Sequence, residues 1–102
     1  MGWATEDIKD RPIAGTILAD TGALLALSGI PVTVVVWAEQ LCILAVAQRN
    51  ALNTDDVEMQ RIYVEPGTEI FPFSSMTFSV NERLVIRCHE NVDGQIQASI
   101  LW

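Results

Sequence analysis

Apolar and polar residues alternate with a period of two in several short stretches of this chain. In residues 95–102, Ile96, Ala98, Ile100 and Trp102 share one side, and mainly polar residues occupy the other. Successive side chains of a β-strand point to opposite faces, so this pattern predicts a strand with one buried face. Because a paired chain end does not fray, we expect Trp102 to pack against the domain.

Two longer stretches are apolar on both sides of the expected strand. In residues 31–39, Val35 and Trp37 lie on the face opposite the other valines, and residues 40–49 are also apolar on both faces. The polar pair at positions 39 and 40 divides this run into halves of strand length, each too short for a membrane-spanning helix. A strand that is apolar on both faces lies centrally or is covered by a second layer or subunit. We therefore expect two buried strands here and no membrane partner.

Turn-forming residues separate about seven short strands along the chain, at a spacing near ten residues. Residues 50–56, 66–69 and 91–94 contain the Asn, Asp, Pro and Gly residues that turns favour. No long stretch has a helical period of 3.6. The pattern therefore predicts an all-β antiparallel sandwich over residues 13–102. Pro72 interrupts one of these strands and predicts an edge strand or a break there.

Residues 1–12 differ from the rest of the chain because they are polar, acidic and end at a proline. This composition predicts an extended N-terminal arm outside the sandwich. It lacks the basic and then apolar order of a secretory signal. Trp3 is an isolated aromatic in this segment. It either folds back onto its own domain or docks on a neighbouring molecule, since tryptophan is enriched at binding hot spots.

Charge and composition limit the classes of partner. The chain has 102 residues, with 13 acidic and 6 basic side chains and a formal net charge of −7. Nucleic acid is not expected as a partner, because phosphate binding requires clustered Lys and Arg. Half of the residues are apolar, which is the upper end for a soluble domain. The surplus predicts an interface, so we expect a homo-oligomer.

The arginines allow two interpretations. Arg83 and Arg87 share one side of an expected strand, and Arg49 and Arg61 come near one another if their strands lie in one sheet. They form either surface ion pairs with neighbouring Asp and Glu, each worth little, or rim contacts of a protein interface. The ion pairs are the favoured interpretation.

Candidate catalytic and metal-binding residues are few. Cys88 and His89 are neighbours on one expected strand, so their side chains point to opposite faces and cannot act as nucleophile and base. Cys42 and Cys88 are interpreted as buried free thiols, with a cross-sheet disulfide as the alternative. The acidic residues at 55, 56 and 58 lack the ligand pattern of a calcium loop. We therefore predict no enzymatic activity, no cofactor and no metal site.

Three segments resemble a known group of proteins: "GTILADTGAL", "LAVAQRNALNTDDVEMQRIYVEPG" and "FSVNERLVIRCHENVDGQIQASI". Their motifs are Gln48-Arg49-Asn50, Asn81-Glu82-Arg83 and the Gly-x-x-Gln-Ala-Ser stretch of residues 94–99. Together they resemble the small structural proteins encoded beside the capsid genes of tailed bacteriophages, which are capsid decoration (cement) or other head-associated proteins. The resemblance covers residues 13–102.

This resemblance implies a jelly-roll-type sandwich that trimerises, with an N-terminal arm that grips the major capsid protein. The chain would then lie on the capsid surface of a virion assembled in the host cytoplasm, where reduced cysteines are expected. The arm residues expected to bind the capsid are Trp3, Ile8, Lys9 and Arg11. The residues expected at the oligomer interface are Val35, Trp37, Leu44, Val46 and Trp102.

A tail or host-receptor-binding module of a phage is the alternative function. Such a module is expected to expose aromatic residues in its loops. The loops at 50–56, 66–69 and 91–94 contain none, which favours the capsid protein.

Overall fold

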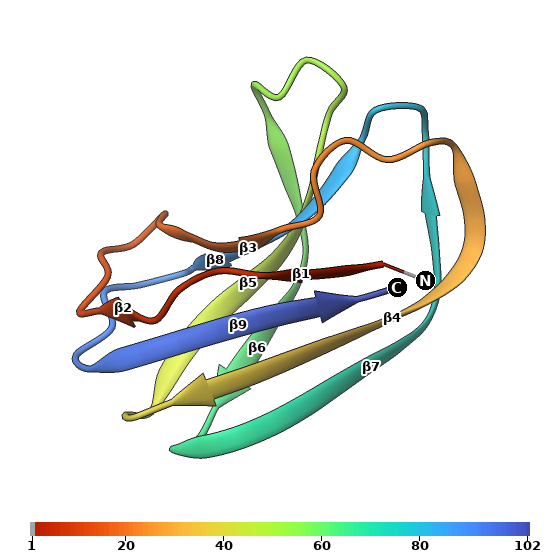
Figure 1. The fold of residues 1–102 in the computed structure, drawn as a ribbon. Helices are drawn as coiled ribbons and strands as arrows, with labels where there is room; N and C mark the ends of the chain where they lie inside the picture. Colours follow the sequence, from red (N-terminus) through yellow and green to blue (C-terminus); the bar gives the residue numbers. More distant parts are fainter. Residues whose placement is uncertain (1) are drawn as a thin grey trace.

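The computed structural model describes residues 2–102, which form two antiparallel sheets (Figure 1). Sheet A has the strand order β1-β9-β4-β7, with the short β2 also pairing with β9, and sheet B has the order β3-β8-β5-β6. The prediction of an all-β antiparallel sandwich is confirmed. Within residues 2–102, no helix has the length and apolar character needed to cross a membrane. The strands are β1 (Trp3–Thr5), β2 (Lys9–Asp10), β3 (Ile17–Asp20), β4 (Leu27–Ala38), β5 (Cys42–Arg49), β6 (Asp56–Val64), β7 (Gly67–Phe78), β8 (Arg83–Cys88) and β9 (Gln95–Leu101).

The strands pair as one long hairpin that is wound into two layers. β5 pairs with β6 at the tip of the hairpin, and the β4–β7 and β3–β8 pairs follow outward along it. The outermost pair is β9 with β1 and β2, which act as one interrupted strand. This nested pairing, divided between two sheets, is the topology of a jelly roll. The jelly-roll-like fold implied by the sequence is therefore confirmed.

The core lies between the two sheets and is filled by alternate residues of their strands. Sheet A contributes Val34, Val36 and Ile100, and sheet B contributes Leu44 and Ile86, all without exposed surface. β4 and β5 follow one another in the chain but belong to different sheets. The long apolar run therefore consists of two buried strands, as predicted, and it crosses between the layers where its polar residues lie.

Pro72 lies in β7, which is an edge strand that pairs with β4 alone. Its register partner on β4 is Thr33. Proline has no N–H to donate. An edge strand tolerates it because one side of such a strand faces solvent and needs no donor. The prediction of an edge strand at Pro72 is confirmed.

Residues 3–10 belong to the sandwich, and the prediction of an arm outside it is wrong in this respect. β1 pairs with β9 from Trp3↔Leu101 to Thr5↔Ser99, and Lys9 in β2 pairs with the same strand. The physical reason is that β9 would otherwise present a row of unpaired backbone groups at the edge of sheet A. The segment is extended, as expected, but it is paired along that edge. Met1 of the predicted arm lies outside the described residues.

The two chain ends hold one another. The Gly2 N–H donates to the Trp102 carbonyl at 2.6 Å, and the Trp102 N–H donates to the Gly2 carbonyl at 3.0 Å. The Trp102 side chain is partly buried and packs against the core. A Cβ on Gly2 would overlap the indole ring of Trp102, so a larger residue at this position would displace the ring. The prediction that the C-terminus is paired and packed is confirmed.

Candidate interaction surfaces

The residues predicted for an oligomer interface do not share one surface. Val35 and Trp37 are half-buried on the outer face of sheet A. Leu44 and Val46 have no exposed surface and lie in the core, so their assignment to an interface is wrong. The reason is that β5 lies inside sheet B, between β8 and β6, and these two residues face sheet A. Trp102 is partly buried against the same core.

The outer side of β5 explains why this strand is apolar on both faces. Ala45 and Ala47 lie on that side and also have no exposed surface. Arg87 and Arg61 flank Ala45 as its register partners on β8 and β6. The aliphatic stems of long arginine side chains can cover small neighbours while their charged ends stay in water. The outer face of β5 is thus shielded within one chain and needs no second subunit.

The outer face of sheet A carries three rows of uncharged side chains across its strands. The first row is Trp3, Leu101, Thr33 and Pro72, which are successive register partners on β1, β9, β4 and β7. The second row is Thr5, Ser99, Val35 and Ile70. The third row is Gln97, Trp37 and Thr68. We call these three rows the neutral face.

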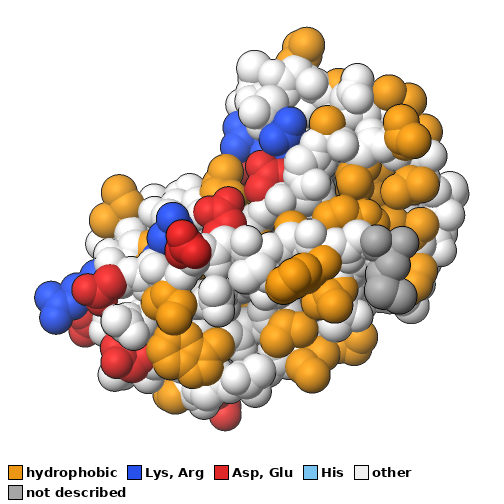
Figure 2. Space-filling view, viewed as in Figure 1, with side chains coloured by type: hydrophobic (Ala, Val, Ile, Leu, Met, Phe, Trp, Pro, Cys, Tyr) orange, Lys and Arg blue, Asp and Glu red, His pale blue; other side chains and the backbone are white. Residues whose placement is uncertain are grey.

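Several apolar side chains of the neutral face reach solvent. Trp3 is 71% exposed and Ile70 is 65% exposed. A hydrogen bond of 2.7 Å between the hydroxyls of Thr5 and Ser99 fixes β1 against β9 on this face. Figure 2 shows hydrophobic side chains over the region where β1, β9, β4 and β7 lie. An uncharged surface with exposed apolar groups, on a chain of net charge −7, is a candidate protein interface.

The four residues expected to bind the capsid do not form a single patch. Trp3 pairs near the end of β9 and belongs to the neutral face. Ile8, Lys9 and Arg11 lie near the start of β9, where the Arg11 N–H donates to the Gly94 carbonyl at 2.9 Å. Ile8 and Arg11 are exposed there. These residues are not part of the neutral face. Lys9 is the register partner of the core-facing Ile96, and its Nζ lies 3.9 Å from a carboxylate oxygen of Glu6.

The outer face of sheet B is charged and gathers four of the six basic residues of the chain. Arg49 and Arg83 are direct register partners on β5 and β8. Arg61 and Arg87 lie on either side of Ala45, which is the second outward-facing position of β5 from Arg49. Three adjacent strands, β6, β5 and β8, thus place these four side chains on one face.

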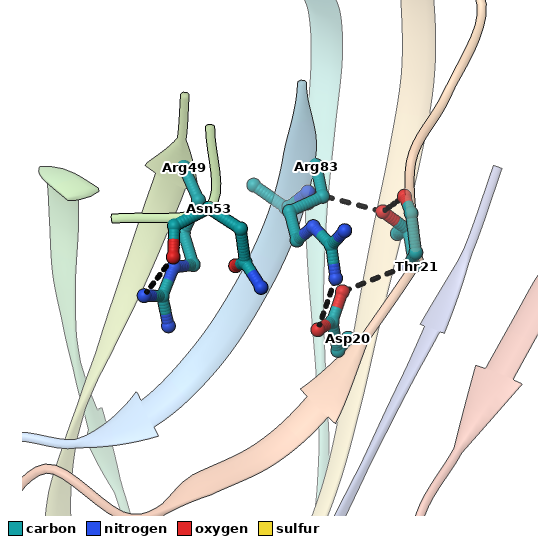
Figure 3. Close-up of polar contacts among 7 residues, drawn as sticks. Asp20, Thr21, Arg49, Asn53 and Arg83 are labelled. Atoms are coloured by element: carbon teal, nitrogen blue, oxygen red, sulfur yellow. Dashed lines mark hydrogen bonds and ion pairs between the residues drawn. The ribbon is translucent and has the colours of Figure 1, made fainter. Parts of the chain in front are cut away.

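Three of these arginines pair with carboxylates of the same chain. The three ion pairs are Arg83–Asp20 at 3.2 Å, Arg87–Asp56 at 3.2 Å and Arg61–Glu58 at 3.3 Å. The interpretation as surface ion pairs is confirmed for these residues. Arg49 instead donates from Nη2 to the backbone carbonyl of Asn53 at 3.1 Å (Figure 3).

The cysteines and the histidine are not arranged for catalysis. Cys42 and Cys88 are buried free thiols, as predicted. Burial raises the pKa of each thiol to about 11, so both are protonated at neutral pH. His89 lies on the side of the strand opposite Cys88, with its Nδ1 3.7 Å from Glu58. Within residues 2–102, no three His, Cys, Asp or Glu side chains are grouped to hold a metal ion.

Two open grooves follow β7. One, of about 340 Å³, lies at the open edge between β6 and β7 and includes Met59, Phe73 and Met76. The other, of about 430 Å³, includes Phe78 and Val80. Among residues 2–102, uncharged side chains alone line both grooves.

The exposed aliphatic members of the neutral face, Ile70 and Leu101, were not predicted from the sequence. The signal for Leu101 was present in the alternation of the last strand, where it stands opposite Trp102. Ile70 stands out of phase with Phe71 and Phe73 in the same strand, which placed it on the outer side. The sequence does not reveal the strand order, which brings both residues onto the same face of sheet A as Trp3.

Comparisons with protein families and with curated proteins find no match to this chain. Among solved structures, the chain is similar to one described as "CBM4 structure and function", with a TM-score of 0.43 and 8% sequence identity. The similarity covers 99% of this chain and 91% of the other.

Proposed function

We propose that this chain is a non-enzymatic structural protein of a phage virion, which binds the outside of the capsid as a homo-oligomer. The observation that carries this proposal is the neutral face, an uncharged surface across sheet A with exposed apolar side chains. The resemblance of three sequence segments to cement and head-associated proteins supports the same role. The exposed aromatic residue Trp3 lies on a strand, in β1, which supports packing on a broad surface.

The neutral face is assigned to contact between copies of this chain. Two molecules of net charge −7 repel one another, and the repulsion is smallest where neither presents a charge. Trp3 and Trp37 supply large aromatic anchors. Val35 and Ile70 are β-branched, so ordering them in an interface costs little side-chain entropy. A trimer joined at this face is the oligomer that we propose.

Attachment to the major capsid protein is assigned to Ile8, Lys9 and Arg11. They lie beside the start of β9, and they include both of the basic residues that are outside sheet B. A capsid protein with an acidic surface would complement them. Each oligomer would then bridge neighbouring capsid subunits, and the added buried interface would resist the pressure of the packaged DNA.

The test combines the mass in solution, from light scattering, with co-sedimentation on undecorated phage capsids. Ile70→Thr is the informative variant because Ile70 is 65% exposed and its replacement leaves the core intact. Tyr63→Thr is the matched control, since Tyr63 is also 65% exposed but lies on sheet B. We expect the wild type and Tyr63→Thr to be trimers that pellet with capsids. We expect Ile70→Thr to be monomeric and to remain in the supernatant.

A wild-type monomer would overturn the proposed interface. A trimer that stays in the supernatant would overturn the capsid assignment, and it would favour a tail or host-receptor-binding module instead. Equal loss of assembly in Ile70→Thr and Tyr63→Thr would show that the neutral face has no special role.

A further inference from the structure

The charged face of sheet B holds one more positive charge than it has carboxylate partners. Its four arginines face the three carboxylates of Asp20, Asp56 and Glu58. Within residues 2–102, no carboxylate lies within ion-pair distance of Arg49. Its side chain is held by a backbone carbonyl, which satisfies one N–H. Asp56 is the register partner of Arg49 on β6, but its carboxylate forms an ion pair with Arg87 and not with Arg49.

Arg49 and Arg83 also lie directly opposite one another across β5 and β8. Like charges at such positions are unfavourable. The Nε atoms of both arginines are buried and have no hydrogen-bond partner. A buried donor without a partner is costly, and more so when it belongs to a charged group. These two N–H groups are therefore donors for which the chain itself supplies no acceptor.

The surroundings of the pair have a defined shape. The next outward-facing pair along the same strands is Ala47 with Val85, and both are fully buried. The loop after β5 is fixed because the side-chain oxygen of Asn50 accepts the N–H groups of Thr54 and Asp55 at 3.0 and 3.3 Å. Figure 2 shows a hollow beside the projecting lobe formed by this loop, with basic and acidic side chains along it.

We propose that Arg49 and Arg83 bind a carboxylate of an acidic peptide segment on a partner protein. A carboxylate has two oxygens in a plane, and the parallel N–H groups of a guanidinium fit them. One carboxylate also brings one negative charge, which balances the single unpaired charge of Arg49. A phosphate dianion would instead leave an excess of negative charge beside Asp20 and Asp56.

Asn53 controls access to this site. In the view of Figure 3 the side-chain amide of Asn53 projects between the guanidinium groups of Arg49 and Arg83. Asn53 is exposed and has a φ of 57°, a conformation that glycine adopts without cost. Asn53→Gly therefore removes the amide and keeps the loop backbone, including the carbonyl that Arg49 contacts. The carboxylate enters as the Asn53 side chain moves out.

The test follows the arginine Nε–H signals by ¹H–¹⁵N NMR of the full chain during titration with a blocked Asp-Glu-Asp peptide. The neutral Asn-Gln-Asn peptide and inorganic phosphate are the comparison probes. We expect saturable shifts of the Arg49 and Arg83 signals with the acidic peptide alone. Arg49→Gln should weaken binding about tenfold or more, since it removes a charge-assisted pair. Asn53→Gly should strengthen it, and the control Arg61→Gln should change it less than about twofold.

Shifts that do not saturate, or that survive Arg49→Gln, would overturn the site. Tighter binding of phosphate than of the peptide would overturn the choice of a carboxylate. Weaker binding in Asn53→Gly would show that the amide is a ligand and overturn its role as a cover. The site lies on sheet B, opposite the neutral face, so this proposal does not depend on the function proposed above.

Discussion

Leu44→Ala is expected to destabilise the fold by about 3–5 kcal/mol. Leu44 has no exposed surface, and its register partners Ile62 and Cys88 are buried as well. The substitution removes three buried carbons, worth about 2.5 kcal/mol in transfer free energy. The cavity left in an interior strand adds to this, which gives the upper part of the range. Domains of this size have a free energy of unfolding of about 5–15 kcal/mol, so the variant should still fold.

Val35→Ala is the matched substitution on the neutral face. Val35 is half-buried and points away from the core, so its truncation should cost less than about 1 kcal/mol in the monomer. It should instead weaken self-association. Urea unfolding followed by far-UV circular dichroism measures the first effect, and light-scattering mass measures the second. Dissociation of the oligomer by Leu44→Ala with unchanged stability would contradict the core position of Leu44. A urea midpoint lowered as much by Val35→Ala as by Leu44→Ala would contradict the outer position of Val35.

Three further perturbations test the fold. Deletion of residues 1–12 should lower Tm or unfold the chain, because it removes the partner of β9; an unchanged Tm would restore the idea of a free arm. Gly2→Ala should expel the indole of Trp102, at a cost of about 1–3 kcal/mol, and shift tryptophan fluorescence to the red; unshifted emission would contradict this packing. The pKa of Cys42 and Cys88 rises from 9.0 to about 11 on folding. The folded chain thus holds protons that the unfolded chain releases, and stability should fall as pH rises from 9 to 11; a flat urea midpoint over this range would refute the burial of the thiols.

The sequence was sufficient for the fold class because the alternation of apolar residues is a local signal. The last strand, with Ile96, Ala98 and Ile100 on one side, was assigned correctly, since each of these residues is fully buried. Pro72 also predicted the position of its strand, because a missing N–H is tolerated only at an edge or a break. Features of this kind depend on single residues and their neighbours in the chain.

The interface residues could not be sorted from the sequence, because β5 is apolar on both sides for two different reasons. Leu44 faces the core, whereas Ala45 is covered by the arginines of adjacent strands. The sequence pattern of a strand covered in this way matches that of a strand covered by a second subunit. Only the strand order, which places β5 between β8 and β6, separates the two cases.

The first strand, β1, belongs both to the predicted arm and to the neutral face. Trp3 contributes to the neutral face only because β1 is paired with β9, where the Thr5–Ser99 and Gly2–Trp102 contacts hold it. A change in this segment therefore alters stability and the interface together. Ile70 lies on the same face but on β7, at the opposite edge of sheet A. A loss of assembly in Ile70→Thr without a loss of stability would thus isolate the interface from the fold, which no truncation of the first strand can do.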